Sequence, residues 1–209
     1  AVTAFVTDDM ELARRAKKKT YKIDARCANL EAVCYNLIAT QSPVASDFRL
    51  LQTIIYIDFN LQRMSDKVRR IARAAKRKVN NDIEFPAEMV ALIEQEAASV
   101  YQVLGSTAAA LVNNDLAAVL ALSEEDEAVH GAYQEFFRVF NRTETMEVAD
   151  DAQMDDFRRT VMVSRYLDRI ANIAMESAYR LVFLLTGQRW GADDIADADE
   201  EELESMRIP

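Results

Sequence analysis

The sequence predicts an all-α fold, and two observations support that prediction. The chain has 209 residues, of which only 4 are Gly and 3 are Pro, whereas strands need turns every ~8–12 residues that are usually built from Gly, Pro, Asn or Asp. Hydrophobic residues make up 50% of the chain and recur at three- and four-residue steps, which is the period of an amphipathic helix. No apolar run reaches the ~18 residues of a membrane span, so we expect helices that pack around an internal core.

The first helices are expected between residues 1 and 78. The opening residues AVTAF resemble the end of a helix, so we expect residues before them, and Asp8 or Asp9 can cap the helix that follows. That helix extends to about residue 41. Its apolar stripe consists of Ile23, Cys27, Leu30, Cys34, Leu37 and Ile38. Ser42 and Pro43 end it, and a second long helix is expected from about 48 to 78. Its inward-facing residues run from Leu51, Ile54, Ile55 and Phe59 to Ile71.

Three further helices are expected after residue 84. Pro86 suits a first helical turn, and the helix it opens extends to about residue 112. A turn with a cap follows at 113–115, and another helix continues to about residue 140. We expect a loop over residues 143–151 and a last helix to about residue 186, with Gly187 as its C-cap. Long amphipathic helices joined by short loops are typical of antiparallel bundles.

An internal repeat divides the chain into two similar parts. QRMSDKVRRIA at 62–72 recurs as DRIANIAMESA at 168–178, an offset of 106 residues. Together with the matching order of loops and helices, this repeat predicts two homologous antiparallel three-helix bundles, at 1–80 and 84–188. The opening helix of the first bundle is expected to be missing or partial.

Charge is unevenly distributed along the chain. The net charge is −10, and residues 189–209 carry eight acids against Arg189 and Arg207. This composition predicts a C-terminal tail that is disordered or loosely helical. The acidity of the whole chain argues against non-specific binding of nucleic acid.

Side chains that often take part in catalysis are scarce. Cys27 and Cys34 are seven residues apart and are expected to be small core residues of a protein in the reducing cytoplasm. His130, the single histidine, is expected to be a partly exposed helix residue, because no Cys or Ser partner completes a triad with it. The aromatic stripe on the same helix is expected to pack in the core; it consists of Tyr133, Phe136, Phe137 and Phe140. The sequence also lacks a Gly-rich phosphate loop, so we do not expect an enzyme.

Four segments, in this order, resemble the PhoU family of phosphate-signalling regulators. LIATQSPVASDFRLL at 37–51 is similar to the family's segment around Gln, Pro-Val-Ala and Asp-Leu-Arg, with Phe48 in place of Leu. LQRMSDKVRRIA at 61–72 and YLDRIANIAMESAYRLVFLLTG at 166–187 occupy the places of the two family motifs. EEDEAVHGAYQEFF at 124–137 matches the helix before the second motif. The likeness covers nearly all of residues 1–188 and is strongest towards actinobacterial members.

The resemblance implies two symmetric three-helix bundles and a role in phosphate homeostasis. Such a protein is a cytoplasmic accessory protein of the phosphate-specific transport system and a negative regulator of phosphate-starvation signalling. It couples the phosphate ABC transporter to a sensor histidine kinase. The implied partners are the kinase, the transporter ATPase and a second copy in a homodimer, with the inner membrane reached only through these partners.

The resemblance also implies a metal site, because some members hold iron, zinc or other metals at Glu/Asp-x-x-x-Asp motifs. Carboxylates at i and i+4 on facing helices can surround a metal cluster. Each motif here keeps one carboxylate of the pair, since Gln62 accompanies Asp66 and Asn172 accompanies Asp168, and neutral amide oxygens are weaker ligands for hard cations. Candidate ligands for a divalent or iron-type ion are Asp58, Asp66, Asp168 and Glu176. Arg70, on the face of Asp66, favours a salt-bridged polar face instead.

The basic run at 69–78 has three possible explanations. Cations are favoured at the C-terminal end of a helix, but the run could also contact an acidic partner surface or anionic headgroups, or hold the chain's own acidic tail. Candidate partner-contact or framework residues are Arg63, Arg169, Arg70 and Arg73. Two other functions stay open from the residues alone, a metal-binding helical bundle and a dimerising scaffold without phosphate signalling.

Overall fold

The computed structural model of the chain is helical in all its long segments. It describes residues 1–80, 84–143, 151–197 and 199–208, so most of the loop expected at 143–151 lies outside the described residues. The helices are α1 (Val2–Val6), α2 (Met10–Gln41), α3 (Ala45–Asn80), α4 (Ala87–Asn113), α5 (Leu116–Thr143), α6 (Asp151–Thr186), α7 (Ala192–Asp197) and α8 (Glu200–Ser205). The all-α prediction is confirmed, and none of the described helices is long and apolar enough to cross a membrane.

The helices begin and end where the sequence supplies capping groups. Asp9 precedes α2 and accepts a hydrogen bond from the backbone N–H of Leu12 at 2.8 Å. Asp115 does the same for α5, accepting from the N–H of Ala118 at 3.0 Å. Gly187 follows α6 at a φ of +75°, a left-handed conformation that costs glycine little. The predicted caps at these three ends are therefore confirmed.

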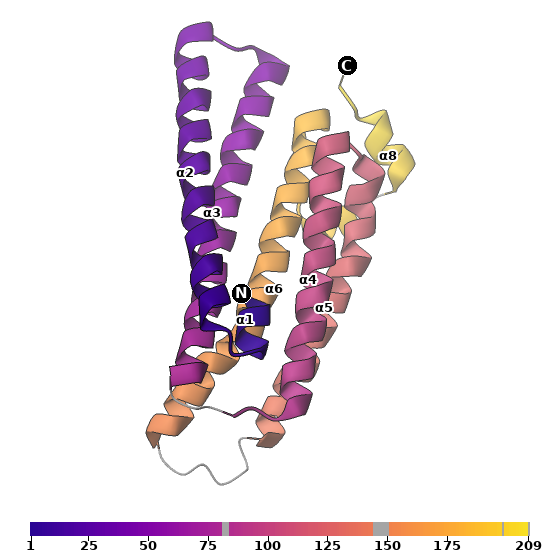
Figure 1. The fold of residues 1–209 in the computed structure, drawn as a ribbon. Coiled ribbons are helices and arrows are strands. Elements are labelled where there is room, and N and C mark those ends of the chain that lie inside the picture. Colours follow the sequence, from indigo (N-terminus) through magenta and orange to yellow (C-terminus); the bar gives the residue numbers. More distant parts are fainter. Residues whose placement is uncertain (81–83, 144–150, 198, 209) are drawn as a thin grey trace.

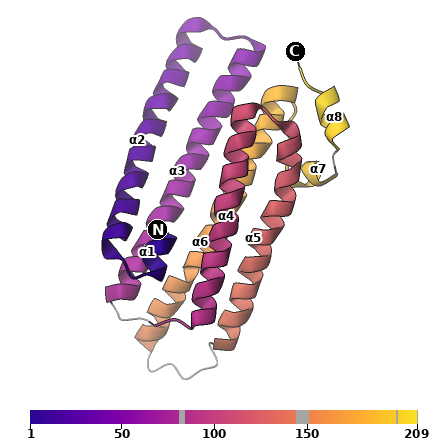
Figure 2. The same ribbon diagram turned by 45° about the vertical axis from the view of Figure 1, so that its right-hand side comes forward.

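The long helices form two groups, which meet where α3 packs on α6 (Figure 1). In the first group α2 and α3 form a long antiparallel hairpin, and in the second α4, α5 and α6 pack on one another. The short helix α1 lies between the groups and contacts α2, α3 and α4, as the turned view in Figure 2 also shows. The helices are those of the predicted bundle pair, and the domain boundaries at residues 80 and 188 stay a prediction.

The core is richest in the second group of helices. Its largest fully buried side chains include Phe136, Leu122 and Leu181. On α2, by contrast, only one line of the predicted stripe is buried, with Cys27 at 3% and Cys34 at 1% exposure, while Ile23, Leu30 and Leu37 are 38–43% exposed. The reason is that α2 packs mainly on α3 and the five-residue α1.

One predicted core residue of α3 lies at the surface. Phe59 was expected to face inward and is 58% exposed, with its ring centre 5.8 Å from the guanidinium carbon of Arg63. The helix already uses two other faces to pack on α2 and α6, so an apolar residue between them remains at the surface.

The acidic C-terminal segment contains ordered elements. The sequence favoured a disordered or loosely helical tail, and its described residues include the short helices α7 and α8, which both contact α5. Ile195 is 3% exposed, and the N–H of Ile208 donates to the carbonyl of Leu185 at 2.8 Å. Net charge alone does not reveal such anchoring contacts.

Candidate functional site

The candidate site is the seam along which α3 and α6 run antiparallel (Figure 1). Arginines on one helix meet aromatic or acidic partners on the other at three levels. Arg63 pairs with Glu176 at 2.5 Å. The guanidinium carbon of Arg180 lies 3.6 Å from the ring centre of Tyr56, and that of Arg70 lies 5.9 Å from the ring centre of Tyr166. We call this surface the α3–α6 seam. It consists of Tyr56, Arg63 and Arg70 on α3 and of Tyr166, Glu176 and Arg180 on α6.

The middle of the seam holds the two groups of helices together. Arg63 donates both to Glu176 and, at 2.9 Å, to the side-chain oxygen of Asn60. Asn60 is fully buried and donates to the hydroxyl of Ser177 at 3.0 Å. A buried, fully bonded amide of this kind fixes the register between two helices. Arg63 therefore bridges α3 and α6, whereas Arg169, which has the corresponding place in the second motif, is exposed on α6.

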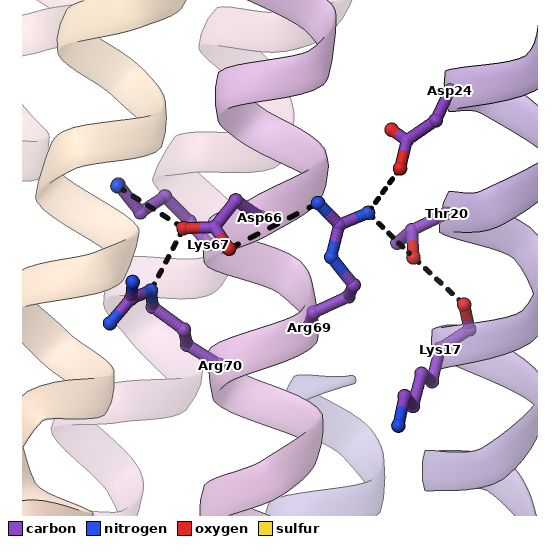
Figure 3. A network of polar contacts seen from close by, with 7 residues as sticks. All are labelled: Lys17, Thr20, Asp24, Asp66, Lys67, Arg69 and Arg70. Carbon is purple, nitrogen blue, oxygen red and sulfur yellow. Dashed lines mark hydrogen bonds and ion pairs between the residues drawn. The ribbon is translucent and has the colours of Figure 1, made fainter.

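Asp66 of the first motif is surrounded by cations (Figure 3). Its Oδ2 accepts from Nε of Arg70 at 2.8 Å, and nitrogens of Lys67 and Arg69 lie 3.7 and 4.0 Å from the carboxylate. The hydrogen bond from Arg70 is the main cause that lowers the pKa of Asp66, and the charges of all three cations add to it. The predicted pairing of Arg70 with Asp66 is confirmed, and these cations oppose the binding of a metal ion there.

Part of the basic run has a structural task. Arg69 reaches across to α2, where it pairs with Asp24 at 2.5 Å and donates to the hydroxyl of Thr20 at 3.4 Å (Figure 3). Lys78 is 9% exposed at its side chain and pairs with Asp8 at 2.5 Å. Arg73, by contrast, is exposed beside the seam. The run therefore contains both cations that pair with acids elsewhere in the chain and exposed cations such as Arg73.

Asp58 lies in a different environment, between α3 and the cysteine line of α2. It is 4% exposed, and burial raises its pKa. Burial is also the main cause that raises the pKa of the Cys27 thiol to about 11, and the negative charge of Asp58 adds to the shift. Cys27 and Cys34 are buried and free, so the prediction of small core thiols is confirmed.

We expect both thiols to react slowly with a thiol-labelling reagent in the folded protein. With the pKa of Cys27 at about 11, its thiolate fraction at pH 8 falls roughly 100-fold below that of an ordinary thiol, and burial slows the reaction further. Labelling with dithiobis(nitrobenzoate) with and without denaturant measures this protection. Asp58→Asn should speed the labelling of Cys27, and rapid native labelling at the unfolded rate would contradict the buried environment.

The second motif faces a cluster of acids on α4 and α5. Asp168 lies 3.9 Å from a ring nitrogen of His130 and accepts from the amide of Asn172 at 3.2 Å. Burial raises the pKa of Asp126 on α5, and the charge of Asp168 raises it further. Glu96 on α4 is fully buried, and both of its carboxyl oxygens lack a hydrogen-bond partner within the described residues.

Glu96 has the most perturbed acidity in this cluster. Burial is the main cause that raises its pKa to about 8, and the nearby charge of Asp168 contributes. The hydroxyl of Ser164 is close enough to favour the charged form but makes no well-formed hydrogen bond with the carboxyl, whose two oxygens have no partner among the described residues. Glu96 was not among the predicted site residues, although it lies three residues after Ile93 and four before Val100, both buried, and this spacing is a signal for a core position.

The predicted metal ligands do not gather at one place. Asp58 lies beside the cysteines, Asp66 beside three cations, Asp168 beside His130, and Glu176 is paired with Arg63. Over the part of the chain that the structure describes, no group of three or more His, Cys, Asp or Glu side chains is arranged to hold a metal ion. Metal binding at these residues stays a prediction.

The chain is similar to proteins of one family over most of its length. Residues 1–75 match the family model described as "PhoU domain". The phosphate-specific transport system accessory protein PhoU of Serratia marcescens is 24% identical, over 100% of this chain and 81% of that protein. PhoU homolog 2 of Mycobacterium tuberculosis is 25% identical, over 90% of this chain and 85% of that protein.

Solved structures share the fold. The crystal structure of PhoU from Pseudomonas aeruginosa has a TM-score of 0.79 at 21% identity, over 90% of this chain and 87% of that one. The PhoU regulatory protein of the Streptococcus pneumoniae phosphate transport system has a TM-score of 0.77 at 21% identity, with 90% and 86% covered. The chain is therefore similar to PhoU proteins over most of its length and shares their fold, and its residues 1–75 match the PhoU domain model.

Proposed function

We propose that the chain is an accessory protein of a phosphate-specific transport system, acting in the cytoplasm as a negative regulator of phosphate-starvation signalling. The observation that carries the proposal is the similarity to PhoU accessory proteins along both helix groups, with 90–100% of the chain aligned. Their name ties them to phosphate-specific transport. The histidine kinase, the transporter ATPase and a homodimeric state are the finer parts of this proposal.

The proposed mechanism is regulation by docking. A regulator shifts a partner's equilibrium only if it prefers one of that partner's states. The α3–α6 seam offers a rigid surface for such a preference, because Arg63 and buried Asn60 lock the two helices. Exposed cations lie on these helices, including Arg73 and Arg169. On a chain with a net charge of −10, this local positive charge suits an acidic partner surface.

The test is direct binding to two purified partners from the same genome, the transporter ATPase and the cytoplasmic domain of the kinase. We expect the double variant Arg73→Gln/Arg169→Gln to bind at least one partner several-fold more weakly than wild type, mainly through a slower association that depends on salt. Biolayer interferometry at two salt concentrations measures both effects.

The matched control is Arg138→Gln, which removes an exposed arginine from α5, where it pairs with Glu135 at 2.6 Å. It should bind like wild type. Folded wild-type protein that binds neither partner would contradict the proposal and favour the dimerising scaffold.

A further inference from the structure

A cavity of about 350 Å³ opens at the end of the α3–α6 seam, where α6 leads into α7. Its walls come from three parts of the chain: one residue of α3, the last turns of α6 and the segment that follows α6. The residues that matter for its chemistry are Tyr56, Tyr179, Arg180, Phe183, Arg189 and Trp190. We call it the aromatic–arginine pocket.

The pocket carries two arginines that form no ion pair with the described residues. The guanidinium of Arg180 stacks on Tyr56 at 3.6 Å, and that of Arg189 lies 5.7 Å from the ring centre of Phe183. Neither guanidinium has a carboxylate partner in the described residues, and Glu176, at the pocket wall, is already bonded to Arg63. Stacking fixes the plane of a guanidinium but leaves N–H donors on its edge for an incoming anion.

The residue types that line the pocket indicate what kind of ligand carries the anionic group. Trp, Tyr and Arg are the residue types that most often dominate the binding energy of protein–protein interfaces. A site for free phosphate usually adds backbone N–H groups, from a helix N-terminus or a nest. The N–H of Gly191, at the pocket wall, is not available because it donates to Asp194 at 2.7 Å. The pocket therefore suits a side chain presented by a protein better than a small free anion.

We propose that the aromatic–arginine pocket is the docking site for a partner-protein segment that presents an acidic side chain next to an apolar one. The acidic group lies between Arg180 and Arg189, and the apolar side chain packs on Phe183 and Trp190. This inference rests on the proposed function, because it names the place where the transporter ATPase or the kinase engages the chain.

The test uses Trp190, the single tryptophan of the chain. Protein labelled with 5-fluorotryptophan gives one ¹⁹F resonance, which reports directly on the pocket wall. We expect the purified ATPase or the purified kinase domain to shift or broaden this resonance. We expect Arg180→Gln/Arg189→Gln to weaken that binding about 10- to 100-fold, while Arg138→Gln stays within about twofold of wild type.

A second variant shows whether weaker binding comes from the lost arginines or from a misfolded chain. Arg189→Gln alone removes an exposed side chain, so it should fold like wild type and still bind several-fold more weakly. Partner binding that leaves both the resonance and the affinity of the double variant unchanged would overturn the inference while the proposed function stands. Failure of wild type to bind either partner would instead overturn the proposed function, and the inference with it. A saturable shift with inorganic phosphate, and none with the partners, would make the pocket a small-anion site.

Discussion

Relative to the Glu96→Gln variant, the wild-type chain is expected to lose free energy of unfolding between pH 5 and pH 8.5. Glu96 is fully buried, and its pKa in the folded chain is raised to about 8 from its ordinary value of 4.5. The folded state therefore holds a proton that the unfolded state releases, so stability is fully present below about pH 4.5 and is lost as pH rises through 8. The loss from this one group is roughly 4 kcal/mol between pH 5 and pH 8.5.

Urea denaturation of wild type and Glu96→Gln across this pH range measures the difference between their free energies of unfolding. The contributions of the other titrating groups cancel in this difference. Glu94→Gln is the matched control, because it removes a carboxylate from an exposed position of the same helix and should follow the wild-type pH dependence. A difference in stability between wild type and Glu96→Gln that stays constant from pH 5 to pH 8.5 would show that the carboxyl is charged and well solvated.

The protonated state of Glu96 also bears on the metal prediction. A carboxylic acid with a pKa of about 8 is mostly neutral at pH 7, and burial raises the pKa of Asp126 as well. Glu96 in this neutral form adds little negative charge to attract a hard cation to Asp168. In the first motif the cause is different, because Arg70 and its neighbours already neutralise Asp66. Among the described residues, Asp66 of the first motif is thus paired with Arg70, and Glu176 of the second is paired with Arg63.

The sequence was sufficient where a local pattern decides the structure. Asp9 and Gly187 mark helix ends through backbone chemistry that depends on a few neighbouring residues. The pairing of Arg70 with Asp66 follows from the four-residue spacing on one helix. In each case the residues that interact are close in the sequence.

The sequence was insufficient where contacts between helices that are far apart in the chain determine the environment of a residue. The exposure of Phe59 depends on which faces of α3 meet α2 and α6, and periodicity does not tell these faces apart. Glu96 meets Asp168 only because α4 packs on α6. Arg180 was absent from the predicted site residues, and its contact with Tyr56 joins positions on two different helices. The α7–α8 segment is likewise anchored by Ile195. Amino-acid composition does not reveal that this side chain is buried in the fold.

Phe5→Ala is expected to destabilise the protein by about 3–5 kcal/mol, the range for removing a buried aromatic ring. Phe5 has no exposed surface, its ring centre lies 5.8 Å from that of Phe85, and the ammonium of Lys78 lies 5.6 Å from it. Without the ring, Lys78 keeps Asp8 as its ion-pair partner but loses the aromatic face that covers its nearly buried side chain. Urea denaturation measures the loss, and Phe48→Ala, at a site that is 45% exposed, is the control with a small expected effect.

Helix α1 contacts α2, α3 and α4 and so helps to join the two groups of helices. The steepness of the urea unfolding transition of Phe5→Ala is therefore as informative as its midpoint. If this contact couples the two groups, Phe5→Ala should lower the cooperativity as well as the stability, and fluorescence of Trp190, beside the second group, should no longer coincide with circular dichroism. Hydrogen exchange should speed up first in α1 and in the adjacent turns of α3. A loss below about 1 kcal/mol with coincident transitions would show that α1 contributes little, and that the α3–α6 seam, through Asn60 and Arg63, holds the groups together by itself.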